Sequence, residues 1–499
     1  MTDHRSIGAV VRAQAAATPE REVLVHRDAR WTWAQLDAEA DRWAAMLRAA
    51  GVASGDRVAV AGRPEPRFLF ALLGCARIGA VYQGLDPKHR AEELRYVLGD
   101  SEPCIVLDPA DLLADVELAV RRLAGRELLD ALAAAQSVPA EQLDAVDPRS
   151  PVAIVYTSGS TGKPKGALIA HEAFVRTAEI QTARWFVTEA PSMLCNLPIN
   201  HVGAIGNICA SVLVAGGRLV FQERFDADEV LELIARERID HWAAVPTMLQ
   251  LSVASERWDD ADLSSVRAVL WSGGAAPLQL VAELRRRFGA LRMSYGSTET
   301  IGEVCFADPD ADDDVLAHTI GRPASEYEVR LATPDGGTCA AGEPGELVVR
   351  GICQALGYWR NPAATAELLD ADGWLHTGDV AVERPDGNLE LVGRTREMYK
   401  SGGYNVYPRE VELAIEEHPG VEVAAVVALA DELYGEIGHA WVQAPASAVD
   451  AEALQEHLRA RLANYKVPKH VTVVEELPLL SIGKVDKHAL RARASRPAG

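Results

Sequence analysis

The stretch YTSGSTGKPKG, from Tyr156 to Gly166, combines glycines, two lysines and a cluster of Ser and Thr residues directly after the apolar run 152–155. Glycine backbones turn sharply and can present their N–H groups to an anion, lysines add positive charge, and hydroxyl groups add donors. Many Gly/Ser stretches are solvated surface loops, but two lysines after a strand favour a ligand. The pattern predicts a loop that holds a polyphosphate.

The same stretch does not fit the phosphate loop of P-loop ATPases and kinases, which has the pattern G-x-x-x-x-G-K-[ST]. Pro164 stands where that pattern requires Ser or Thr, and Thr157 stands where it requires the first glycine. Proline also lacks the backbone N–H group that a donor array needs. A P-loop ATPase or kinase is therefore the less favoured class. Formation of AMP rather than ADP would argue against it.

The composition is that of a globular protein with an acidic surface. The 499 residues are 48% hydrophobic and 24% charged, and the formal net charge is -22. Such a charge repels nucleic acid and anionic lipid surfaces. The seven scattered cysteines form no C-x-x-C pair, the first 21 residues lack the apolar core of a signal peptide, and the run 423–430 is too short to span a bilayer. We therefore expect a cytoplasmic protein.

Strand and helix patterns alternate along the chain. The apolar run 57–62 reads as a strand, 67–80 as a buried helix and 104–108 as another strand. This alternation predicts an α/β fold with a largely parallel sheet. From about 320 to 391 the chain is richer in Gly and Pro and has short strand-like pieces, which predicts a β-subdomain. About 100 residues of α+β pattern follow Gly393, a typical domain size.

The quoted stretch resembles the phosphate loop of adenylate-forming enzymes, the group that includes acyl-CoA synthetases, carrier-protein adenylation domains and firefly-type luciferases. Further segments resemble motifs of the same family, in family order and over nearly the whole chain. They are PINHVG (198–203), YGSTE (295–299), WLHTGD (374–379), GRTREMYKSGGYNVYPREVE (from 393) and LPLLSIGKVDK (477–487). Together they make a chance match very unlikely.

The resemblance implies a fold and a reaction. The fold would be a large N-terminal domain of layered α/β subdomains plus a β-subdomain, residues 1–393, followed by a small mobile α+β C-terminal domain, residues 394–499. The enzyme would use ATP and Mg²⁺ to convert a carboxylic acid into acyl-AMP with release of pyrophosphate, and would then transfer the acyl group to the thiol of CoA. The work of the protein in such a reaction is positioning and electrostatic stabilisation.

The resemblance also implies an ATP site. Residues 157–165 would cradle the β- and γ-phosphates, and Tyr295 would stack near adenine against the segment 273–275. Thr298 would contact phosphate, and Glu299 would bind Mg²⁺, a hard cation that prefers oxygen ligands. Asp379 would accept hydrogen bonds from the ribose hydroxyls. The full set is Thr157, Ser158, Gly159, Ser160, Thr161, Gly162, Lys163, Lys165, Gly273, Gly274, Ala275, Tyr295, Gly296, Asp379 and Arg394.

The C-terminal motifs imply two catalytic states. Lys484 would bridge the acid and the α-phosphate during adenylation, although Leu480 stands where the family commonly has Thr. Rotation about Arg396, where Asp or Lys is usual, would then present a thiol tunnel. Gly402, Gly403 and Tyr404 would line that tunnel.

Residues near three motifs are predicted to surround the acid. His201 would act as a gate, with a satisfied core histidine as the alternative, and Gly296 would leave room for an acid larger than acetate. The absence of an Asp near PINHVG argues against α-amino acids. An aromatic or medium-size apolar acid is expected, flanked by His201, Val202, Trp271, Ser272, Met293, Ser297 and Ile301, with Asn207 as a further polar contact.

Other acceptors stay open at this stage. The adenylate could instead pass to a carrier-protein thiol or to another nucleophile, and the activated group could be an unusual anion. A non-catalytic nucleotide-binding protein is disfavoured because Glu299, Asp379 and Lys484 are all retained. The expected partners are small molecules, with an acyl carrier protein as the alternative acceptor, and the expected oligomeric state is a monomer or a homodimer.

Overall fold

The computed structural model describes residues 6–86, 88–136, 143, 145–157, 163–445, 449–478 and 485–494. The chain forms two compact units: unit 1 comprises Met1–Val329 with Val349–His376, and unit 2 comprises Arg330–Val348 with Thr377–Gly499. The α/β class predicted from the sequence is confirmed. The predicted domain boundary between residues 393 and 394 is the place where the C-terminal domain would rotate. The division into two units does not test such a rotation, so this boundary stays a prediction.

The larger sheet of unit 1 has nine strands in the order β15-β14-β13-β12-β11-β9-β10-β1-β2. Neighbouring strands from β13 to β1 are parallel, whereas β14, β15 and β2 run antiparallel to their neighbours. The strands are β1 (Glu22–His26), β2 (Ala29–Thr32), β9 (Ser192–Cys195), β10 (Arg218–Phe221), β11 (His241–Ala244), β12 (Ala268–Trp271), β13 (Leu291–Ser297), β14 (Gly302–Phe306) and β15 (Arg322–Pro323).

The second sheet of unit 1 has six strands in the order β6-β5-β3-β4-β7-β8, and only β8 is antiparallel to its neighbour. The strands are β3 (Arg57–Ala61), β4 (Val81–Leu85), β5 (Ile105–Asp108), β6 (Arg122–Ala124), β7 (Pro151–Thr157) and β8 (Lys165–Ala170). The YTSGSTGKPKG stretch thus begins on β7 and ends on β8.

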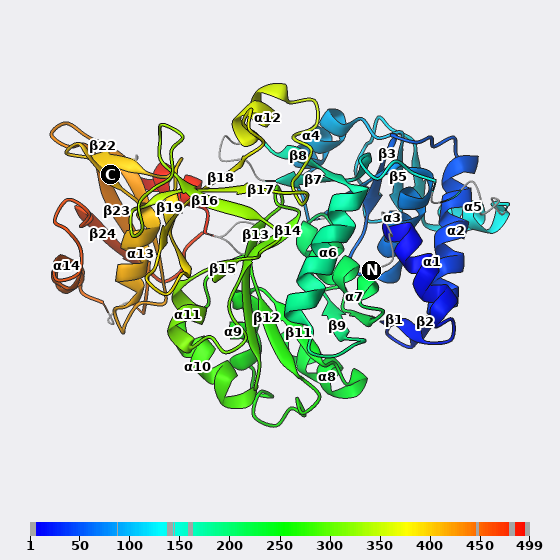
Figure 1. The fold of residues 1–499 in the computed structure, drawn as a ribbon, viewed down its shortest axis with the longest axis horizontal. Coiled ribbons are helices and arrows are strands. Elements are labelled where there is room, and N and C mark those ends of the chain that lie inside the picture. Colours follow the sequence, from blue (N-terminus) through cyan, green and yellow to red (C-terminus); the bar gives the residue numbers. More distant parts are fainter. Residues whose placement is uncertain are drawn as a thin grey trace. The chain divides into compact units, whose positions relative to one another are not determined.

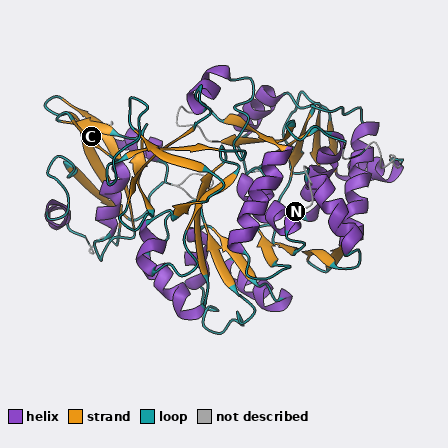
Figure 2. Cartoon of the chain, in the orientation of Figure 1, coloured by secondary structure: helices purple, strands orange, loops and turns teal. Residues whose placement is uncertain are grey.

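Helices cover the sheets of unit 1 (Figure 2). Helix α6 contacts β7 and β8 of the smaller sheet and β14 of the larger one, so it lies between the two sheets (Figure 1). The helices are α1 (Ile7–Ala17), α2 (Trp33–Ala49), α3 (Pro66–Ile78), α4 (Ala91–Ser101), α5 (Gly125–Ala134), α6 (His171–Trp185), the π-helix η2 (Gly203–Ala210), α7 (Ser211–Val214), α8 (Ala227–Glu237), α9 (Pro246–Val253), α10 (Leu278–Arg287), α11 (Asp313–His318) and α12 (Pro362–Leu368).

Local signals explain where these helices begin and end. Helix α2 starts at a capping box, in which the Thr32 side chain and the Gln35 side chain each bond the backbone N–H of the other residue. Leu36, Ala40, Trp43 and Leu47 recur at helical spacing and are all buried. Helix α3 ends at Gly79, whose φ of 72° is a left-handed conformation that glycine adopts without strain.

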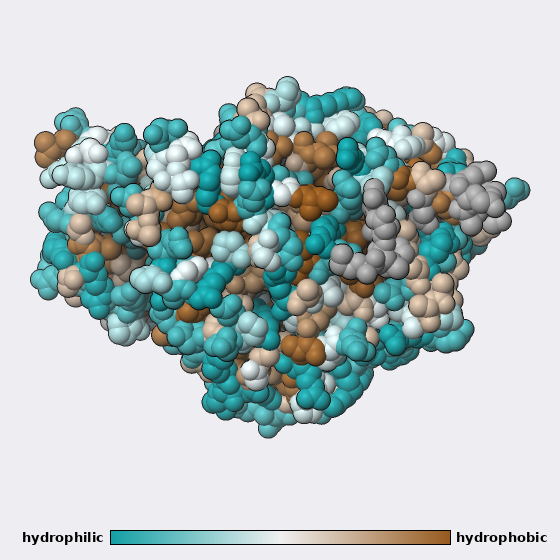
Figure 3. All heavy atoms as spheres, in the orientation of Figure 1, coloured by the Kyte–Doolittle hydropathy of each residue, from teal (hydrophilic) through white to brown (hydrophobic). Residues whose placement is uncertain are grey.

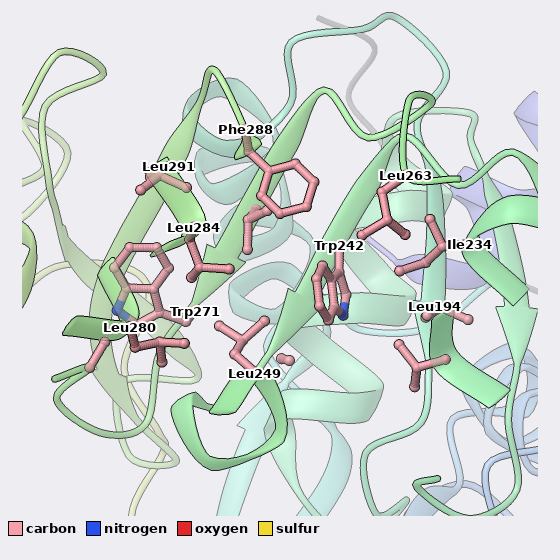
Figure 4. Close-up of a cluster of buried hydrophobic side chains, with 14 of the residues drawn as sticks. Leu194, Ile234, Trp242, Leu249, Leu263, Trp271, Leu280, Leu284, Phe288 and Leu291 are labelled. Atoms are coloured by element: carbon pink, nitrogen blue, oxygen red, sulfur yellow. The ribbon is translucent and has the colours of Figure 1, made fainter. Parts of the chain in front are cut away.

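An apolar core lies between the larger sheet and the helices α8, α9, α10 and α11. Figure 4 shows Trp242, Trp271, Leu280 and Phe288 pointing into it. The surface seen in Figure 3 is mostly hydrophilic with scattered apolar side chains. None of the described helices is both long enough and apolar enough to cross a membrane.

Unit 2 contains two smaller sheets. One has the order β16-β17-β18-β19 and the other β21-β20-β23-β22, with β24 also paired to β23. Helix α13 packs on β22 in a separate apolar core. The elements are β16 (Glu328–Ala332), β17 (Gly345–Arg350), β18 (Leu375–Glu383), β19 (Leu389–Arg394), β20 (Tyr399–Ser401), β21 (Tyr404–Val406), α13 (Pro408–Glu416), β22 (Val423–Asp431), β23 (Gly435–Gln443), α14 (Ala451–Arg459), β24 (His470–Val474) and α15 (Lys487–Ala494).

Candidate active site

Three of the predicted motifs meet at one edge of the larger sheet. The segment 196–203 follows β9, the segment 272–277 follows β12, and the turn 298–301 follows β13. These three strands belong to the parallel part of the sheet, so their carboxyl ends share an edge. Ligands of open α/β sheets bind outside the carboxyl ends of the strands. The topology therefore places His201, Gly273 and Thr298 at the side of the sheet where a ligand site is expected.

The PINHVG segment is fixed against the smaller sheet. The Tyr82 hydroxyl donates to the carbonyl oxygen of Ile199 at 3.3 Å. A Cβ on Gly84 would overlap the same carbonyl, so only glycine allows this close approach. The segment continues into the π-helix η2, a rare element that often marks functional sites. The π-helix was not predicted from the sequence, because the apolar composition of this segment is equally compatible with an α-helix.

The YGSTE motif ends in a tight turn with a strained residue. The backbone N–H of Ser297 donates to the Thr300 hydroxyl at 2.8 Å, and the Thr300 N–H donates back to the Ser297 hydroxyl at 3.2 Å. Ile301 has a φ of 64°, which is unusual for a β-branched residue. Strain of this kind persists where the surroundings determine the conformation, and it is common at ligand sites. The turn holds Thr298 and Glu299 in place between two paired strands.

Glu299 is linked to the phosphate-loop hairpin through Tyr358. The Tyr358 hydroxyl donates to Glu299 Oε1 at 2.7 Å, and the N–H of Ala355 donates to the Glu299 carbonyl at 2.8 Å. The same segment hydrogen-bonds to β8, since the Trp359 N–H donates to the Gly166 carbonyl at 2.7 Å. The Lys165 ammonium lies 5.1 Å from the centre of the Tyr358 ring. Tyr358 was not predicted, because no motif of the sequence contains it.

The hairpin β7–β8 presents both predicted lysines. Thr157 and Lys165 are paired across the hairpin, so the loop between them is closed at its base. The Lys163 ammonium lies 5.5 Å from the centre of the Tyr96 ring, and the Tyr96 hydroxyl donates to the Pro164 carbonyl at 3.2 Å. Such cation–π contacts orient an ammonium without neutralising it. The predicted residues Ser158, Gly159, Ser160, Thr161 and Gly162 lie outside the described residues.

The proposed adenine wall is open. Gly273, Gly274 and Ala275 are exposed, and a Cβ on Gly273 or Gly274 would meet no atom closer than 3.8 Å. Trp271 on β12 is paired with Met293 on β13, so the chain two residues further brings Gly273 alongside Tyr295. The arrangement agrees with a flat ligand between them, although the individual contacts stay predictions.

The structure divides the predicted acid-pocket residues between two faces of the sheet. Trp271 and Met293 are both buried in the apolar core that contains residues of α9 and α10, and Figure 4 shows Trp271 there. Ser294, the next residue on β13, therefore faces the opposite side of the sheet. Ser272 directly follows β12, and both serine hydroxyls lie near Glu303, which bonds Asn207 of η2. We do not retain Trp271 and Met293 as pocket residues, because strand alternation turns their side chains away from it. The Val202 side chain and the Ile301 backbone carbonyl both lie near Gly206, and the roles of the two residues in a pocket stay predictions.

Gly296 has a packing reason that the sequence analysis did not give. A Cβ at this position would overlap the carbonyl oxygen of Gly302 on the paired strand β14. The glycine is thus required by the close approach of β13 and β14. Its presence is no longer independent evidence for a roomy acid pocket.

In unit 2, Asp379 and Arg394 face each other across β18 and β19. The Arg394 Nε donates to Asp379 Oδ1 at 2.8 Å, and Asp379 is almost fully buried. The two residues predicted to contact ribose and phosphate are therefore neighbours. Their contacts to a nucleotide stay predictions.

The predicted tunnel glycines form a two-residue hairpin between β20 and β21. Gly402 and Gly403 have φ values of 59° and 86°, which is the geometry of a type I′ turn. Tyr404 is exposed and stacks on Tyr465 with ring centres 4.6 Å apart. Arg396 is exposed. The roles of these residues in a rotation and a tunnel stay predictions.

Lys484 lies outside the described residues, but the helix that follows it is anchored. The Lys487 ammonium is 2.6 Å from a Glu397 oxygen and 2.8 Å from a Glu412 oxygen. Burial lowers the pKa of Lys487, but the two carboxylates outweigh it and the net shift is upward. This ion cluster ties α15 to α13 and to the segment next to Arg396.

Within the described residues no group of three or more His, Cys, Asp or Glu side chains could hold a metal ion. Glu299 offers a single, partly exposed carboxylate, with one oxygen bonded to Tyr358. A single carboxylate fits Mg²⁺ that is held mainly by nucleotide phosphates, because Mg²⁺ commonly uses one or two protein carboxylates beside substrate oxygens.

Known proteins of similar sequence and structure match nearly the whole chain. The family model described as AMP-binding enzyme matches residues 11–359, and the model described as AMP-binding enzyme C-terminal domain matches residues 410–484. The chain is 36% identical to a feruloyl-CoA synthase of Amycolatopsis sp, over 98% of this chain and 99% of the relative. It is 35% identical to an indoleacetate–CoA ligase of Aromatoleum aromaticum, over 96% and 94%. The crystal structure of ATP-bound MatB from Rhodopseudomonas palustris aligns with a TM-score of 0.89 at 29% identity, over 98% and 99%.

Proposed function

Because this chain belongs to the AMP-binding enzyme family, it is an AMP-forming acid–CoA ligase, and we propose that its acid is an aromatic one. The enzyme uses ATP, Mg²⁺ and CoA. The first half-reaction joins the acid to AMP and releases pyrophosphate, and the second moves the acyl group to the CoA thiol and releases AMP.

The observation that carries this function is the connection from Glu299 to the phosphate-loop hairpin. Tyr358 bonds Glu299 directly, and its ring lies under the Lys165 ammonium. One carboxylate and one cation are thus held by the same side chain at the carboxyl edge of the sheet. Mg²⁺ at Glu299 would neutralise phosphate charge, while Lys163 and Lys165 would do the same from the hairpin.

The chemistry follows from the charges that this site must manage. The acid's carboxylate oxygen attacks the α-phosphorus of ATP, the bond from that phosphorus to the bridging oxygen breaks, and pyrophosphate leaves with its electron pair. A carboxylate is itself a poor electrophile, and the resulting anhydride with AMP is a good one. The CoA sulfur then attacks the acyl carbon, and AMP leaves. We retain Lys484 as the residue that bridges the acid and the α-phosphate.

Two observations support an aromatic acid. Two relatives that are 36% and 35% identical to this chain are named for feruloyl and indoleacetate groups, both aromatic. Val202 and Ile301 are buried apolar residues in the segments that follow β9 and β13, next to the turn that carries Glu299. A medium-size apolar acid is the alternative, and a matched panel of acids separates the two.

The test is mass spectrometry of the products formed from ATP, Mg²⁺ and a panel of aryl and medium-chain acids, with and without CoA. We expect AMP and an aryl-CoA thioester. Thioesters from medium-chain acids alone would overturn the aromatic assignment. Formation of aryl-AMP without a thioester would indicate that the acceptor is a carrier-protein thiol or another nucleophile.

Light scattering of the purified protein would show which of the two expected oligomeric states, monomer or homodimer, the protein adopts.

A further inference from the structure

A carboxyl group, that of Glu303, is buried beside the candidate active site without a cation. Only 2% of the residue is exposed, and it lies on β14 directly after the strained turn of the YGSTE motif. None of the described groups that shift its pKa is a lysine, arginine or histidine. Buried carboxylates are rare unless they are paired, so this one needs an explanation.

A β-bulge turns Glu303 toward α6 and η2. Tyr295 is paired with Cys305 and Gly296 with Glu303, so one step on β13 corresponds to two steps on β14. Val304 is the extra residue, and it reverses the alternation of side chains at this point. Bulges of this kind re-aim side chains, often next to active sites. Glu303 consequently shares the face of Ser294 rather than that of the apolar core.

Residues from the motif-bearing segments surround this carboxyl group. Asn207 of η2 donates through Nδ2 to Glu303 Oε1 at 2.7 Å, and Gln181 of α6 accepts from the Glu303 backbone N–H at 3.0 Å. Ser272 precedes the open glycine segment, and Ser294 precedes Tyr295; both hydroxyls are near enough to lower the pKa of Glu303. The carboxyl group thus lies where the PINHVG, GGA and YGSTE segments converge.

The cluster has unfilled acceptors. Glu303 Oε2 and Asn207 Oδ1 are both buried and have no hydrogen-bond partner within the described part of the chain. Asn207 Nδ2 and the Glu303 N–H each have an acceptor already. The Ser272 and Ser294 hydroxyls are the other donors near the carboxyl group, but neither meets hydrogen-bond geometry with Glu303 Oε2 or Asn207 Oδ1. These two oxygens therefore lack a well-placed donor within the described residues. An unmade hydrogen bond in a buried site costs more than a made one contributes, so a donor that enters here is strongly favoured.

We propose that Glu303 and Asn207 form the remote end of the acid pocket and accept a hydrogen bond from an O–H or N–H group that the acid carries away from its carboxylate. The inference rests on the proposed function and narrows its substrate class to aryl acids that bear a hydroxyl or an amino group. Burial raises the pKa of Glu303 to about 7, which agrees with a carboxyl group that has no cationic partner among the described residues.

The test compares matched acids on the wild-type enzyme. On the aryl scaffold that gives most thioester, kcat/KM is measured for the acid with a ring hydroxyl, the acid with a ring amino group, the unsubstituted acid and the methoxy acid. 4-Hydroxycinnamate, 4-aminocinnamate, cinnamate and 4-methoxycinnamate are one such set. We expect a preference of about 10- to 100-fold for a donor-bearing acid over the unsubstituted acid, and none for the methoxy acid. The hydroxyl and amino arms identify which donor is used.

Two variants connect that preference to Glu303. Glu303→Leu removes both acceptor oxygens and should reduce the preference to within about 3-fold, while Glu303→Gln keeps the shape and one acceptor oxygen and should give an intermediate ratio. The ratio of two substrates on one enzyme sample is independent of the fraction that is folded. Glu237→Gln removes another buried carboxyl group, on α8 and paired with Arg30, and should leave the ratio unchanged.

The outcomes distinguish this inference from the proposed function. If no aryl acid forms an adenylate, the proposed function fails and the inference fails with it. If aryl acids react but donor-bearing acids have no advantage, or if the Glu303 variants keep the wild-type ratio, only the inference is overturned. In those two cases the buried acceptors are satisfied by water or are tolerated as a cost of stability.

Discussion

Replacing Glu303 by glutamine separates the effect of a buried charge from the effect of shape, because glutamine has nearly the same volume and cannot ionise. Burial raises the pKa of Glu303 to about 7, from an ordinary value of 4.5. Between these pH values the folded protein keeps a proton that the unfolded chain has released. The wild-type protein therefore loses stability as the pH rises from about 4.5 to about 7. A separation of about 2.5 pH units corresponds to about 3 kcal/mol.

We expect the free energy of unfolding of Glu303→Gln, minus that of the wild type, to increase by about 2 to 3 kcal/mol between pH 5 and pH 8. Every other titrating group is common to both proteins, so its contribution cancels. Urea unfolding followed by tryptophan fluorescence at pH 5, 6, 7 and 8 measures this difference. The signal reports mainly on unit 1, which contains all of the ten tryptophans except Trp441.

Glu237→Gln is the matched control. Burial raises the pKa of Glu237, but its hydrogen bonds to Arg30 and Arg236 outweigh burial and lower the pKa overall. Glu237 is thus ionised in both states above pH 5, and its difference from the wild type should be constant from pH 5 to pH 8. A Glu303→Gln difference that is also constant over this range would refute the reasoning, because Glu303 would then titrate near its ordinary pKa.

Three further results are expected. Tyr358→Phe removes the hydroxyl that bonds Glu299, so kcat/KM for ATP should fall about 10-fold in a pyrophosphate-release assay and the Mg²⁺ requirement should rise; unchanged ATP kinetics would contradict the role of this contact. Gly296→Ala would force a Cβ onto the Gly302 carbonyl and should destabilise unit 1 by about 2 to 4 kcal/mol, whereas Gly289→Ala meets nothing within 4 Å and should stay within about 0.5 kcal/mol of the wild type in the same urea titration. Lys484→Ala should abolish adenylate formation while sparing thioester formation from supplied aryl-AMP, and equal loss of both half-reactions would be evidence against its assigned role.

The sequence by itself determined the family and the α/β class, and it predicted the nucleotide-binding motifs. These depend on local chemistry: a glycine-rich loop with lysines, a turn that ends in Thr and Glu, and apolar runs with the period of strands or helices. Local backbone preferences act over a few residues, so they can be read without knowing which strands pair. The capping box of α2 and the hairpin glycines 402 and 403 belong to the same class of signal.

Only the tertiary structure decided which side chains share a face and which distant segments touch. Trp271 and Met293 were predicted beside the acid, but strand alternation in the paired sheet places them in the apolar core. Tyr358 reaches Glu299 because the segment 355–359 runs along β8. Glu303 faces Asn207 because a single bulge residue reverses the alternation of β14. The bulge and the contacts between remote segments depend on packing over the whole unit, whereas the patterns that predicted the motifs extend over only a few residues.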